Sequence, residues 1–400
     1  MLKIGIIKEW KQPADKRTVL TPHQCEQLML DHPQIKISVE SSSDRTFTDN
    51  EYRKHGIEIT TDMSDCDMLL GVKEVPPDKL IPNKTYFFFS HTIKKQPYNQ
   101  KLMRALISKK IRMIDFETLT ESNGKRIIGF GNFAGKVGAY NGLLTWGRKY
   151  NTFSLTPAYQ INSYKGIVEE AKSKIKGDIK IVLTGTGRVG GGAYKFLTDI
   201  GLEEISPEDF LKHKKKGIWF THLGSKQLFR RKSDKKYDRK QFHTEPELYE
   251  SSFLQYANQC DLLINGIFWN SRMPRLFETT DIQNSAFKIS VIADVSCDVN
   301  GSVPITYRAT DIFNPAFGVS RKTLQETNPY STDTIDMMTV TNLPTELPKD
   351  ASTFFGKTFV QRLIPEILNP EHSLILDRAT ICLNGKLNKG YEYLKDYAAI

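Results

Sequence analysis

The sequence DIKIVLTGTGRVGGGAYKFLTDI, residues 178–200, decides the fold class. It begins with a β-branched apolar run at residues 179–184, which predicts a buried strand, and it ends with a helical segment at residues 192–200. Between them Gly185, Gly187 and Gly190 have the spacing G-x-G-x-x-G. In such a unit the first glycine allows a tight turn, the second lets a pyrophosphate approach the backbone, and the third lets the helix pack on the strand. The stretch therefore predicts a dinucleotide-binding lobe.

Strands and helices alternate on both sides of this stretch. Apolar runs predict further strands at residues 3–8, 35–40, 68–72, 85–90, 111–116, 261–267 and 288–295. Helices are predicted at residues 22–31, 98–109, 134–149 and 351–363, the third being long and rich in small residues. Strands that alternate with helices predict mostly parallel sheets. We expect an α/β protein of two Rossmann-like lobes with an interdomain cleft.

The choice between NAD and NADP depends on the strand that follows the glycine loop. NAD enzymes place an acidic residue at the end of that strand, where it holds the ribose 2′-hydroxyl. Here the next strand is predicted at residues 204–206, and Ser206 and Pro207 occupy its end. Glu208 and Asp209 come too late, and lysines follow them. The pattern favours NADPH.

Charged side chains follow the predicted strands of the first lobe. Because the carboxyl ends of parallel strands meet at one edge, where ligands bind, these side chains should lie close together. They are Lys8 and Glu9, followed by Lys16 and Arg17, then Lys73 and Glu74, then His91, and then Glu117.

This set suits hydride transfer at a carbon–nitrogen bond. Such a reaction needs groups that move protons at nitrogen and at a carbinolamine oxygen, and Lys73 and His91 can do so when burial and mutual charge bring their pKa values toward neutrality. Glu74 and Glu117 would tune that pair electrostatically. Arg17 has the planar guanidinium that holds a substrate carboxylate through two hydrogen bonds.

Composition indicates an ordinary globular protein. The 400 residues are enough for two or three domains, and no apolar stretch approaches the length of a membrane span. The five cysteines are scattered without metal-ligand spacing, and no signal peptide opens the chain, so a cytoplasmic location and no metal are expected. Much of the net charge of +10 lies between Lys212 and Lys240, which is typical of a solvated loop or hairpin tip.

Several segments, in order along most of the chain, resemble a known family. They are KRTVLTP (16–22), LLGVKEVP (69–76), KTYFFFSHTIKKQ (84–96), VLTGTGRVGGGA (182–193), LLINGIFW (262–269), ADVSCDVNGSVP (293–304) and NLPTELPKDASTFFG (342–356). The chain resembles the lysine-forming saccharopine dehydrogenases and, more closely, the lysine–ketoglutarate reductase half of the bifunctional lysine-degradation enzyme. Both groups are similar to alanine dehydrogenases and to the transhydrogenase nucleotide-binding subunit.

The resemblance implies roles at the substrate site. Lys73 matches the family's proton acceptor and His91 its proton donor. Arg17, Lys94 and Gln96 match residues of the substrate pocket, and the segment between the lobes matches at Lys125, Arg126 and Phe130. The implied reaction joins L-lysine and 2-oxoglutarate, with NAD(P)H, to give saccharopine, or reverses it.

The resemblance also implies the domain boundaries and the cofactor contacts. The substrate lobe would comprise residues 1–131 and 329–400, and the dinucleotide lobe residues 132–328. Fungal members carry a cysteine where this chain has Val189, so a redox disulfide at that position is excluded here. The implied dinucleotide contacts are Gly185, Gly187, Arg188, Val189, Gly190, Ala293, Asp294 and Val295.

Three alternatives remain open at the level of sequence. The fold and the histidine also allow an alanine dehydrogenase-like enzyme. A non-catalytic dinucleotide-binding regulator would keep the fold without the chemistry. The basic segment could bind nucleic acid, but we expect only weak, nonspecific attachment, because no nucleic-acid motif accompanies it.

Overall fold

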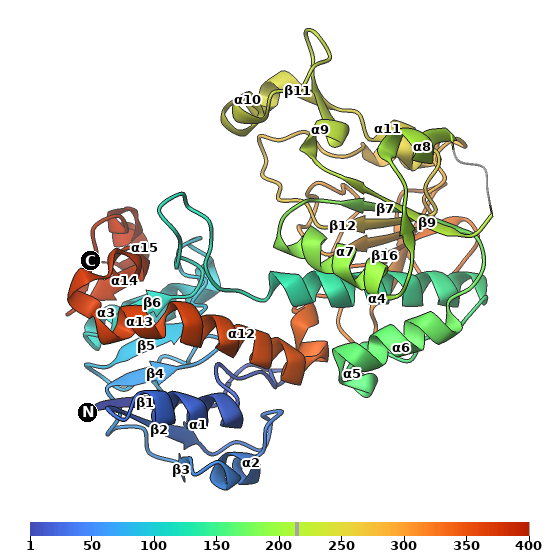
Figure 1. Cartoon of the computed structure of the whole chain (residues 1–400). Coiled ribbons are helices and arrows are strands. Elements are labelled where there is room, and N and C mark those ends of the chain that lie inside the picture. The colour runs from blue at the N-terminus through green and yellow to red at the C-terminus, as the bar shows by residue number, and fades with distance from the viewer. Residues whose placement is uncertain (213–215, 400) are drawn as a thin grey trace. The chain divides into compact units, whose positions relative to one another are not determined.

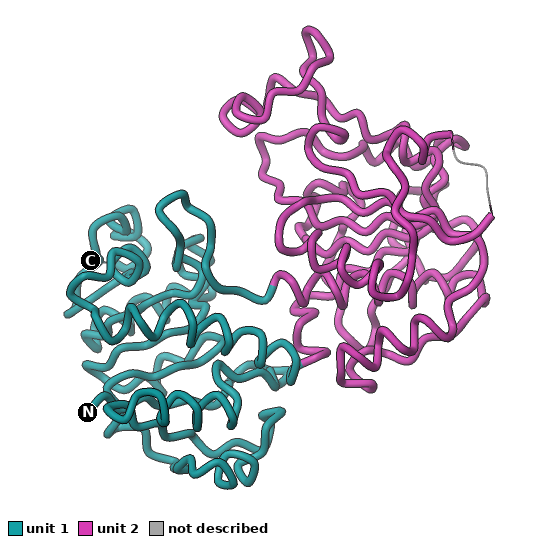
Figure 2. The backbone as a smooth tube through the Cα atoms, in the orientation of Figure 1, with its two compact units in different colours: residues 1–130, 348–400 teal, residues 131–347 magenta. Residues whose placement is uncertain are grey.

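The computed structural model describes residues 1–212 and 216–399 and divides into two compact units (Figure 2). Unit 1 comprises Met1–Phe130 and Pro348–Ile400, and unit 2 comprises Gly131–Leu347. The chain returns to unit 1 at residue 348, not at the expected residue 329. The reason is β16 (Thr334–Met338), which pairs with two strands of the unit 2 sheet and so keeps the segment before residue 348 in that unit.

Unit 1 is built on an eight-stranded sheet of order β18-β17-β6-β5-β4-β1-β2-β3 (Figure 1). The six strands from β6 to β3 are parallel, as the sequence predicts, and the two C-terminal strands are antiparallel. The strands are β1 (Leu2–Ile6), β2 (Ile35–Glu40), β3 (Glu58–Thr60), β4 (Met68–Leu70), β5 (Thr85–Phe88), β6 (Arg112–Asp115), β17 (Thr380–Leu383) and β18 (Lys386–Leu387).

Helices cover both faces of this sheet. The aromatic side chains of β5 point alternately to the two faces and contact different helices on each. Tyr86 and Phe88 belong to a core with residues of α3 and α15, whereas Phe87 lies 6.1 Å from Phe359 of α12, between ring centroids. The unit is thus a three-layer α/β/α domain. Its helices are α1 (Pro22–Asp31), α2 (Asp49–Lys54), α3 (Gln100–Ser108), α12 (Pro348–Arg362), α13 (Ile364–Leu368), α14 (Leu374–Ala379) and α15 (Lys395–Ala398).

Unit 2 holds a second eight-stranded sheet, of order β15-β14-β16-β13-β12-β7-β9-β8. It is parallel from β16 to β8, and β14 and β15 form an antiparallel edge. Two mostly parallel sheets confirm the predicted α/β class. The remaining strands are β7 (Ile179–Thr184), β8 (Glu203–Glu204), β9 (Ile218–Leu223), β12 (Leu262–Asn265), β13 (Val291–Asp294), β14 (Ala316–Ser320) and β15 (Glu326–Thr327).

The long small-residue helix of unit 2, α4 (Gly131–Tyr150), packs closely on its neighbours. A Cβ built at Gly135 would overlap the carbonyl oxygen of Val189 in α7, and one at Gly142 would lie 2.9 Å from the Cβ of Ala293. Glycine is thus required for the approach of the backbones. The other helices are α5 (Ala158–Ile161), α6 (Tyr164–Lys174), α7 (Arg188–Asp199), α8 (Pro207–Lys212), α9 (Ser225–Leu228), α10 (Arg239–Thr244) and α11 (Leu254–Ala257).

The strand expected at residues 204–206 is wrong as the neighbour of β7. The structure has only the two-residue β8 there, at the sheet edge, and β9 lies beside β7. A strand next to the centre of a parallel sheet is covered on both faces and needs apolar side chains. Phe220 and Leu223 of β9 are fully buried, whereas Glu203 and Glu204 are exposed.

The C-terminal part of the basic segment, from Phe229 onward, lies in a hairpin, one of the two structures that its charge pattern predicts. β10 (Phe229–Arg231) and β11 (Tyr249–Ser251) pair antiparallel, and the chain between them lies at the top of unit 2 in Figure 1. Part of its charge is neutralised locally, since Arg230 and Lys235 both pair with Glu250. Lys214 and Lys215 lie outside the described residues. Where the structure describes the chain, no helix is long and apolar enough to cross a bilayer.

Candidate active site

The carboxyl ends of β1, β4, β5 and β6 form one edge of the unit 1 sheet, because these strands are adjacent and parallel. Lys73 and Glu74 follow β4, and His91 follows β5. The Nδ1 atom of His91 lies 2.6 Å from Oε1 of Glu74. The structure therefore brings together side chains that are separated by 17 residues in the sequence.

The Glu74–His91 pair is half-buried and electrostatically strong. Burial alone would raise the pKa of Glu74, but the hydrogen bond and charge of His91 outweigh it and lower that pKa to about 2. The backbone of His91 is left-handed, with φ of 51°, and its ring stacks on Phe89 at an interplanar angle of 20°. Glu74 and Phe89 thus fix the orientation of the imidazole and leave Nε2 as the nitrogen opposite the carboxylate.

Lys73 is held through its backbone by Glu9. The two carboxylate oxygens of Glu9 accept the N–H groups of Val72, at 2.6 Å, and of Lys73, at 2.8 Å. Burial and the charge of Asp15 raise the pKa of Glu9 to about 8 in spite of these hydrogen bonds. Burial, together with the charge of Arg17, lowers the pKa of Lys73. A less basic lysine is what proton exchange near neutral pH requires.

Arg17 is buried, and its partner in the structure is a carboxylate of the same chain. Its Nε donates to Oδ1 of Asp15 at 2.9 Å, and its Nη2 donates to Oδ2. The guanidinium also lies 4.2 Å above the ring of Phe130, which stacks on Phe355 with centroids 4.4 Å apart. The sequence reading assigned no role to Asp15. Its position two residues before Arg17, in the same loop, could have indicated that the two side chains pair.

Glu117 gathers two of the expected substrate ligands. Nζ of Lys94 lies 3.3 Å and Nη2 of Arg126 3.0 Å from its Oε1. Burial raises the pKa of Glu117, but these cations and His91 reverse the effect and lower it. Lys125 is exposed and lies in the turn before Arg126, and the side chain of Gln96 accepts a hydrogen bond from the hydroxyl of Tyr98. The structure therefore does not bring Lys125 or Gln96 to the carboxylates of Glu74 and Glu117.

Asp115 is a further buried carboxylate that the sequence reading missed. It accepts the N–H of Ser90 at 3.0 Å, the N–H of Glu117 at 2.7 Å and the hydroxyl of Ser90. Burial raises its pKa to about 6. Asp115 thereby ties the segment that carries His91 to the one that carries Glu117. Asp115 is the last residue of β6, and the sequence pattern assigns it to an apolar strand, so it was not predicted as a site residue.

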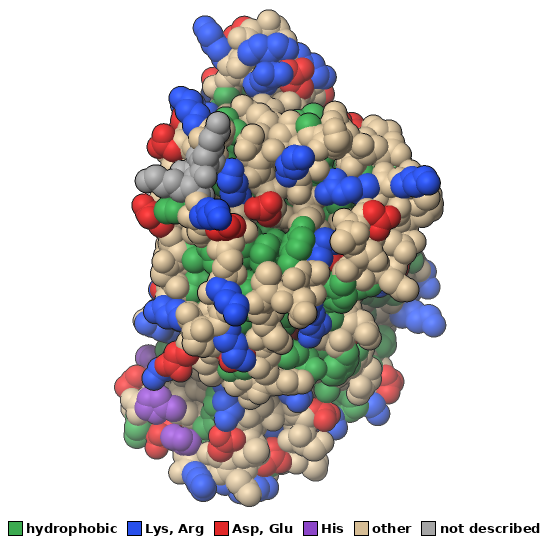
Figure 3. Space-filling view, turned by 90° about the vertical axis from the view of Figure 1, so that its right-hand side faces the viewer, with side chains coloured by type: hydrophobic (Ala, Val, Ile, Leu, Met, Phe, Trp, Pro, Cys, Tyr) green, Lys and Arg blue, Asp and Glu red, His purple; other side chains and the backbone are tan. Residues whose placement is uncertain are grey.

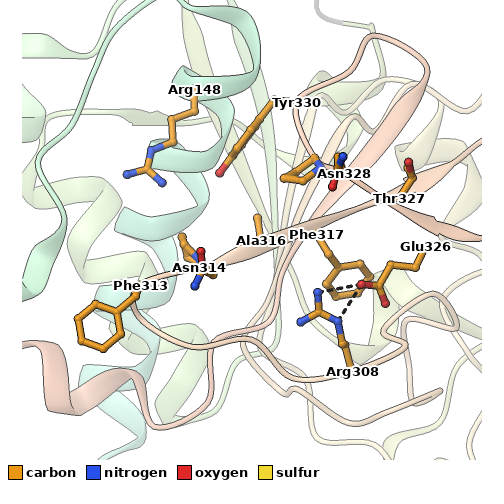
Figure 4. A pocket seen from close by; sticks show the side chains of 12 residues that line it. Arg148, Arg308, Phe313, Asn314, Ala316, Phe317, Glu326, Thr327, Asn328 and Tyr330 are labelled. Carbon is orange, nitrogen blue, oxygen red and sulfur yellow. Dashed lines mark hydrogen bonds and ion pairs between the residues drawn. The ribbon is translucent and has the colours of Figure 1, made fainter. Parts of the chain in front are cut away.

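One pocket adjoins this edge, and another lies in unit 2. A pocket of about 420 Å³ in unit 1 has Glu74, Trp10, Lys11 and Tyr98 among its lining residues. In unit 2, a pocket of about 740 Å³ lies along β14 and β15, where Arg308 pairs with Glu326, and Arg148 of α4 is also among its lining residues (Figure 4). No residue expected to act in catalysis or cofactor binding lines the second pocket.

The glycine loop of unit 2 has the conformation that its spacing predicts. Gly185 has a positive φ of 94°, and a Cβ at Gly190 would overlap the carbonyl oxygen of Gly185. A Cβ at Gly187, by contrast, would meet no atom within 4 Å. Space therefore lies in front of Gly187 and the first amides of α7, where a phosphate would receive hydrogen bonds and the helix dipole.

The expected cofactor residues after β13 have side chains that face the protein. The carboxylate of Asp294 accepts hydrogen bonds from Asn265, Ser296 and Thr306 and is fully buried. Val295 packs on Gly138 of α4. These side chains shape the loops at the sheet edge, so any contact from Ala293, Asp294 and Val295 to a dinucleotide would come from the backbone.

The strand end to which the prediction of NADPH refers is the end of β9 in the observed sheet. Because β9 is the neighbour of β7, the residues to compare are Gly224, Ser225 and Lys226 rather than Ser206 and Pro207. A Cβ at Gly224 would lie 3.3 Å from Cγ2 of Thr186, so this end adjoins the glycine loop. No acidic residue occurs between residues 218 and 228.

Comparison with known proteins agrees with the observed fold. Residues 5–136 match the model of the alanine dehydrogenase/PNT N-terminal domain family. A solved L-alanine dehydrogenase superposes with a TM-score of 0.65 over 99% of both chains at 18% identity, which shows a shared fold.

Relatives that match nearly the whole chain have two kinds of name. An alpha-aminoadipic semialdehyde synthase of Arabidopsis thaliana is 31% identical over 98% of this chain and 41% of its own length, and the mitochondrial one of Bos taurus is 29% identical over 90% and 44%. The chain thus spans less than half of these relatives. An NAD(+)-dependent, L-lysine-forming saccharopine dehydrogenase of Emericella nidulans is 24% identical over 96% of this chain and 97% of its own length. The resemblance inferred from the motifs is confirmed.

Proposed function

We propose that this chain is an NAD(P)-dependent oxidoreductase that acts on the CH–NH bond of saccharopine, forming it from L-lysine and 2-oxoglutarate or cleaving it back. The observation that carries the proposal is the arrangement at the unit 1 edge: a half-buried Lys73 with a lowered pKa beside the Glu74–His91 pair. The likeness to the saccharopine dehydrogenase of Emericella nidulans supports it, as does the likeness to the alpha-aminoadipic semialdehyde synthases.

In the oxidative direction Lys73 takes the proton of the secondary amine. A dinucleotide held by the glycine loop would supply the hydride acceptor for the adjacent carbon. His91, oriented by Glu74, then moves protons as water adds to the carbon–nitrogen double bond and as the carbinolamine collapses to the amine and the keto acid. One water is consumed, and one hydride and one proton leave, so atoms and electrons balance. Reductive condensation follows the same steps in reverse.

The carboxylates of the substrate need cations at the same edge. Lys94 and Arg126 share Glu117, so their charge is only partly neutralised, and a substrate carboxylate can bind beside that carboxylate. Arg17, with Phe130 against its guanidinium, is the proposed ligand from the buried side. Lys125 and Gln96 remain proposed ligands at the rim.

The proposed cofactor is NADPH. In place of a carboxylate, the end of β9 offers the hydroxyl of Ser225 and the ammonium of Lys226, which suit a ribose 2′-phosphate. We expect Ser225→Asp with Lys226→Ala to weaken NADPH binding at least about tenfold while NADH binding is kept or improved. Equal affinities of the unaltered chain for NADH and NADPH would contradict this preference.

The test of the function follows cofactor oxidation with two substrate pairs. We expect turnover with lysine plus 2-oxoglutarate and little with pyruvate plus ammonia. Lys73→Met and His91→Gln should each lower turnover by about a hundredfold or more while dinucleotide binding is retained. Turnover only with pyruvate and ammonia would establish an alanine dehydrogenase instead. Dinucleotide binding without turnover on any amino-acid and keto-acid pair would support the non-catalytic regulator.

A further inference from the structure

A group of three metal-ligating side chains lies in unit 1, in a part of the chain that the proposed reaction does not use. His23 and Glu26 stand three residues apart near the start of α1, so they share one face of that helix. His55 is the C-cap residue of α2. Their ligand atoms all lie within 4.8 Å of one another.

The geometry of the group is close to that of a metal centre. Nδ1 of His55 lies 2.7 Å from Oε2 of Glu26, and Nδ1 of His23 lies 3.9 Å from the same oxygen. Ligand atoms around a tetrahedral zinc ion are about 3.3 Å apart, given bonds of about 2.0–2.1 Å. The two separations that involve Glu26 therefore each differ by about 0.6 Å from that spacing, and the separation of the two imidazole ligand atoms is within 4.8 Å. All three side chains are at least one-third exposed, so small rotations can supply the difference.

The charge of the group also suits a cation. Among residues 1–212 and 216–399, Glu26 forms no ion pair with a lysine or an arginine, and both of its ion-pair partners are these histidines. Its carboxylate is thus not neutralised by a fixed cation. Histidine side chains also gather in one place on the molecular face shown in Figure 3, and the rings of His23 and His55 are 6.1 Å apart.

We propose that His23, Glu26 and His55 bind a zinc ion that fastens the start of α1 to the end of α2. Two imidazoles and one carboxylate suit Zn²⁺, and an exposed site leaves the fourth position to water. Mg²⁺ and Ca²⁺ prefer oxygen ligands and would therefore bind this set poorly. Because bound metal stabilises the folded state, zinc should also raise the temperature at which the chain unfolds.

The experiment is a calorimetric titration of ZnCl₂ into the full chain after treatment with a chelator. We expect one zinc ion per chain, with affinity lowered at least tenfold by His23→Ala, by His55→Ala and by Glu26→Gln. His372→Ala is the matched control, because His372 is an exposed histidine of the same unit outside the group, and it should leave binding unchanged.

Two further measurements keep the proposal falsifiable if a variant is unstable. Co²⁺ in the unaltered chain should give the visible absorption of a tetrahedral centre, and zinc should raise the unfolding temperature of the unaltered chain and of His372→Ala, but not of His23→Ala. MgCl₂ should do neither. Absence of zinc binding, or full binding in the His23→Ala, His55→Ala double variant, would overturn the proposal. Turnover is not the readout, so the result is independent of the proposed reaction.

Discussion

At the scale of single residues, the unit 1 edge contains carboxylates whose pKa values move in opposite directions. Glu74 stays ionised because His91 holds it, whereas burial makes Glu9 a weak acid with a pKa of about 8. The two groups therefore give the protein opposite responses to pH. Each response can be measured by removing the carboxylate that causes it.

Glu9 should make the protein less stable as pH rises. Its folded pKa lies above the unfolded value of 4.5, so the folded state binds the extra proton, and the stability that this proton gives is lost between about pH 4.5 and pH 8. In Glu9→Gln, which cannot ionise, we expect a smaller fall in unfolding temperature between pH 5 and pH 8 than in the unaltered chain. An equal fall in both proteins would show that Glu9 does not carry this dependence.

Glu74 should act through His91 rather than on the substrate. If it only orients the imidazole, Glu74→Gln lowers turnover by about tenfold or more in the presence of His91, but lowers it little further in His91→Gln. Turnover of the four proteins in this double-mutant cycle provides the measurement. Additive losses would mean that Glu74 has a separate role.

Below pH 4.5, the contribution of Glu74 to stability depends on pH in the opposite direction to that of Glu9. Its folded pKa, about 2, lies under the unfolded value, so its pairing stabilises the protein above pH 4.5 and is lost as pH falls toward 2. We expect Glu74→Gln to reduce the loss of stability between pH 5 and pH 3, measured by thermal unfolding. A variant as acid-sensitive as the unaltered chain would disprove this.

At the scale of elements, the glycine loop separates binding from folding. Gly187 faces open space, whereas Gly190 touches the backbone of Gly185. The same substitution at the two positions should therefore have different consequences. The sequence spacing shows which glycines belong to the motif, and the structure shows what each one is for.

Gly187→Ala should fold normally but bind the dinucleotide at least about tenfold more weakly, because its methyl group would occupy the space of the phosphates. Gly190→Ala should lower the free energy of unfolding by about 2 kcal/mol or more, because its Cβ would collide with the β7–α7 turn. Gly191→Ala, at a position with no atom within 4 Å, is the control for both readouts. Cofactor titration and chemical denaturation would measure the two effects.

At the scale of the whole molecule, the C-terminal segment is part of the N-terminal site. Phe355 of α12 is fully buried and contacts Phe130, Phe116 and Phe89, the last of which stacks on His91. Ser352 of the same helix accepts the N–H of Thr18 beside Arg17, at 2.9 Å. Residues more than 200 positions apart thus support one set of side chains.

Phe355→Ala should therefore affect both stability and turnover. Loss of a buried phenylalanine costs about 3–5 kcal/mol, and the loosened Phe89 and Phe130 should lower turnover even where the chain remains folded. The neighbouring Phe354→Ala is the control, since Phe354 is 43% exposed. Unfolding curves and turnover at a temperature below both transitions give the comparison, and equal effects of the two variants would contradict the argument.

The sequence by itself determined features that depend on local pattern. Periodicity and cap residues predict the strands and α1, whose Thr21–Gln24 capping box the structure shows, and the G-x-G-x-x-G spacing predicts the loop. Parallel strands also place Lys73, Glu74 and His91 at one edge, because strand ends converge whenever the sheet order is simple. The charges after each strand were therefore enough to predict that Lys73, Glu74 and His91 lie at one edge of the sheet.

Only the tertiary structure decided which partner each charge has and which strand lies beside which. Arg17 bonds Asp15, Lys94 and Arg126 share Glu117, and β9 rather than β8 adjoins β7. These outcomes depend on burial and on the packing of residues far apart in the sequence. A local sequence pattern contains no information on burial or on long-range packing. Ionic pairing and strand order therefore cannot be predicted from it, because they follow from the free energy of the whole packed domain.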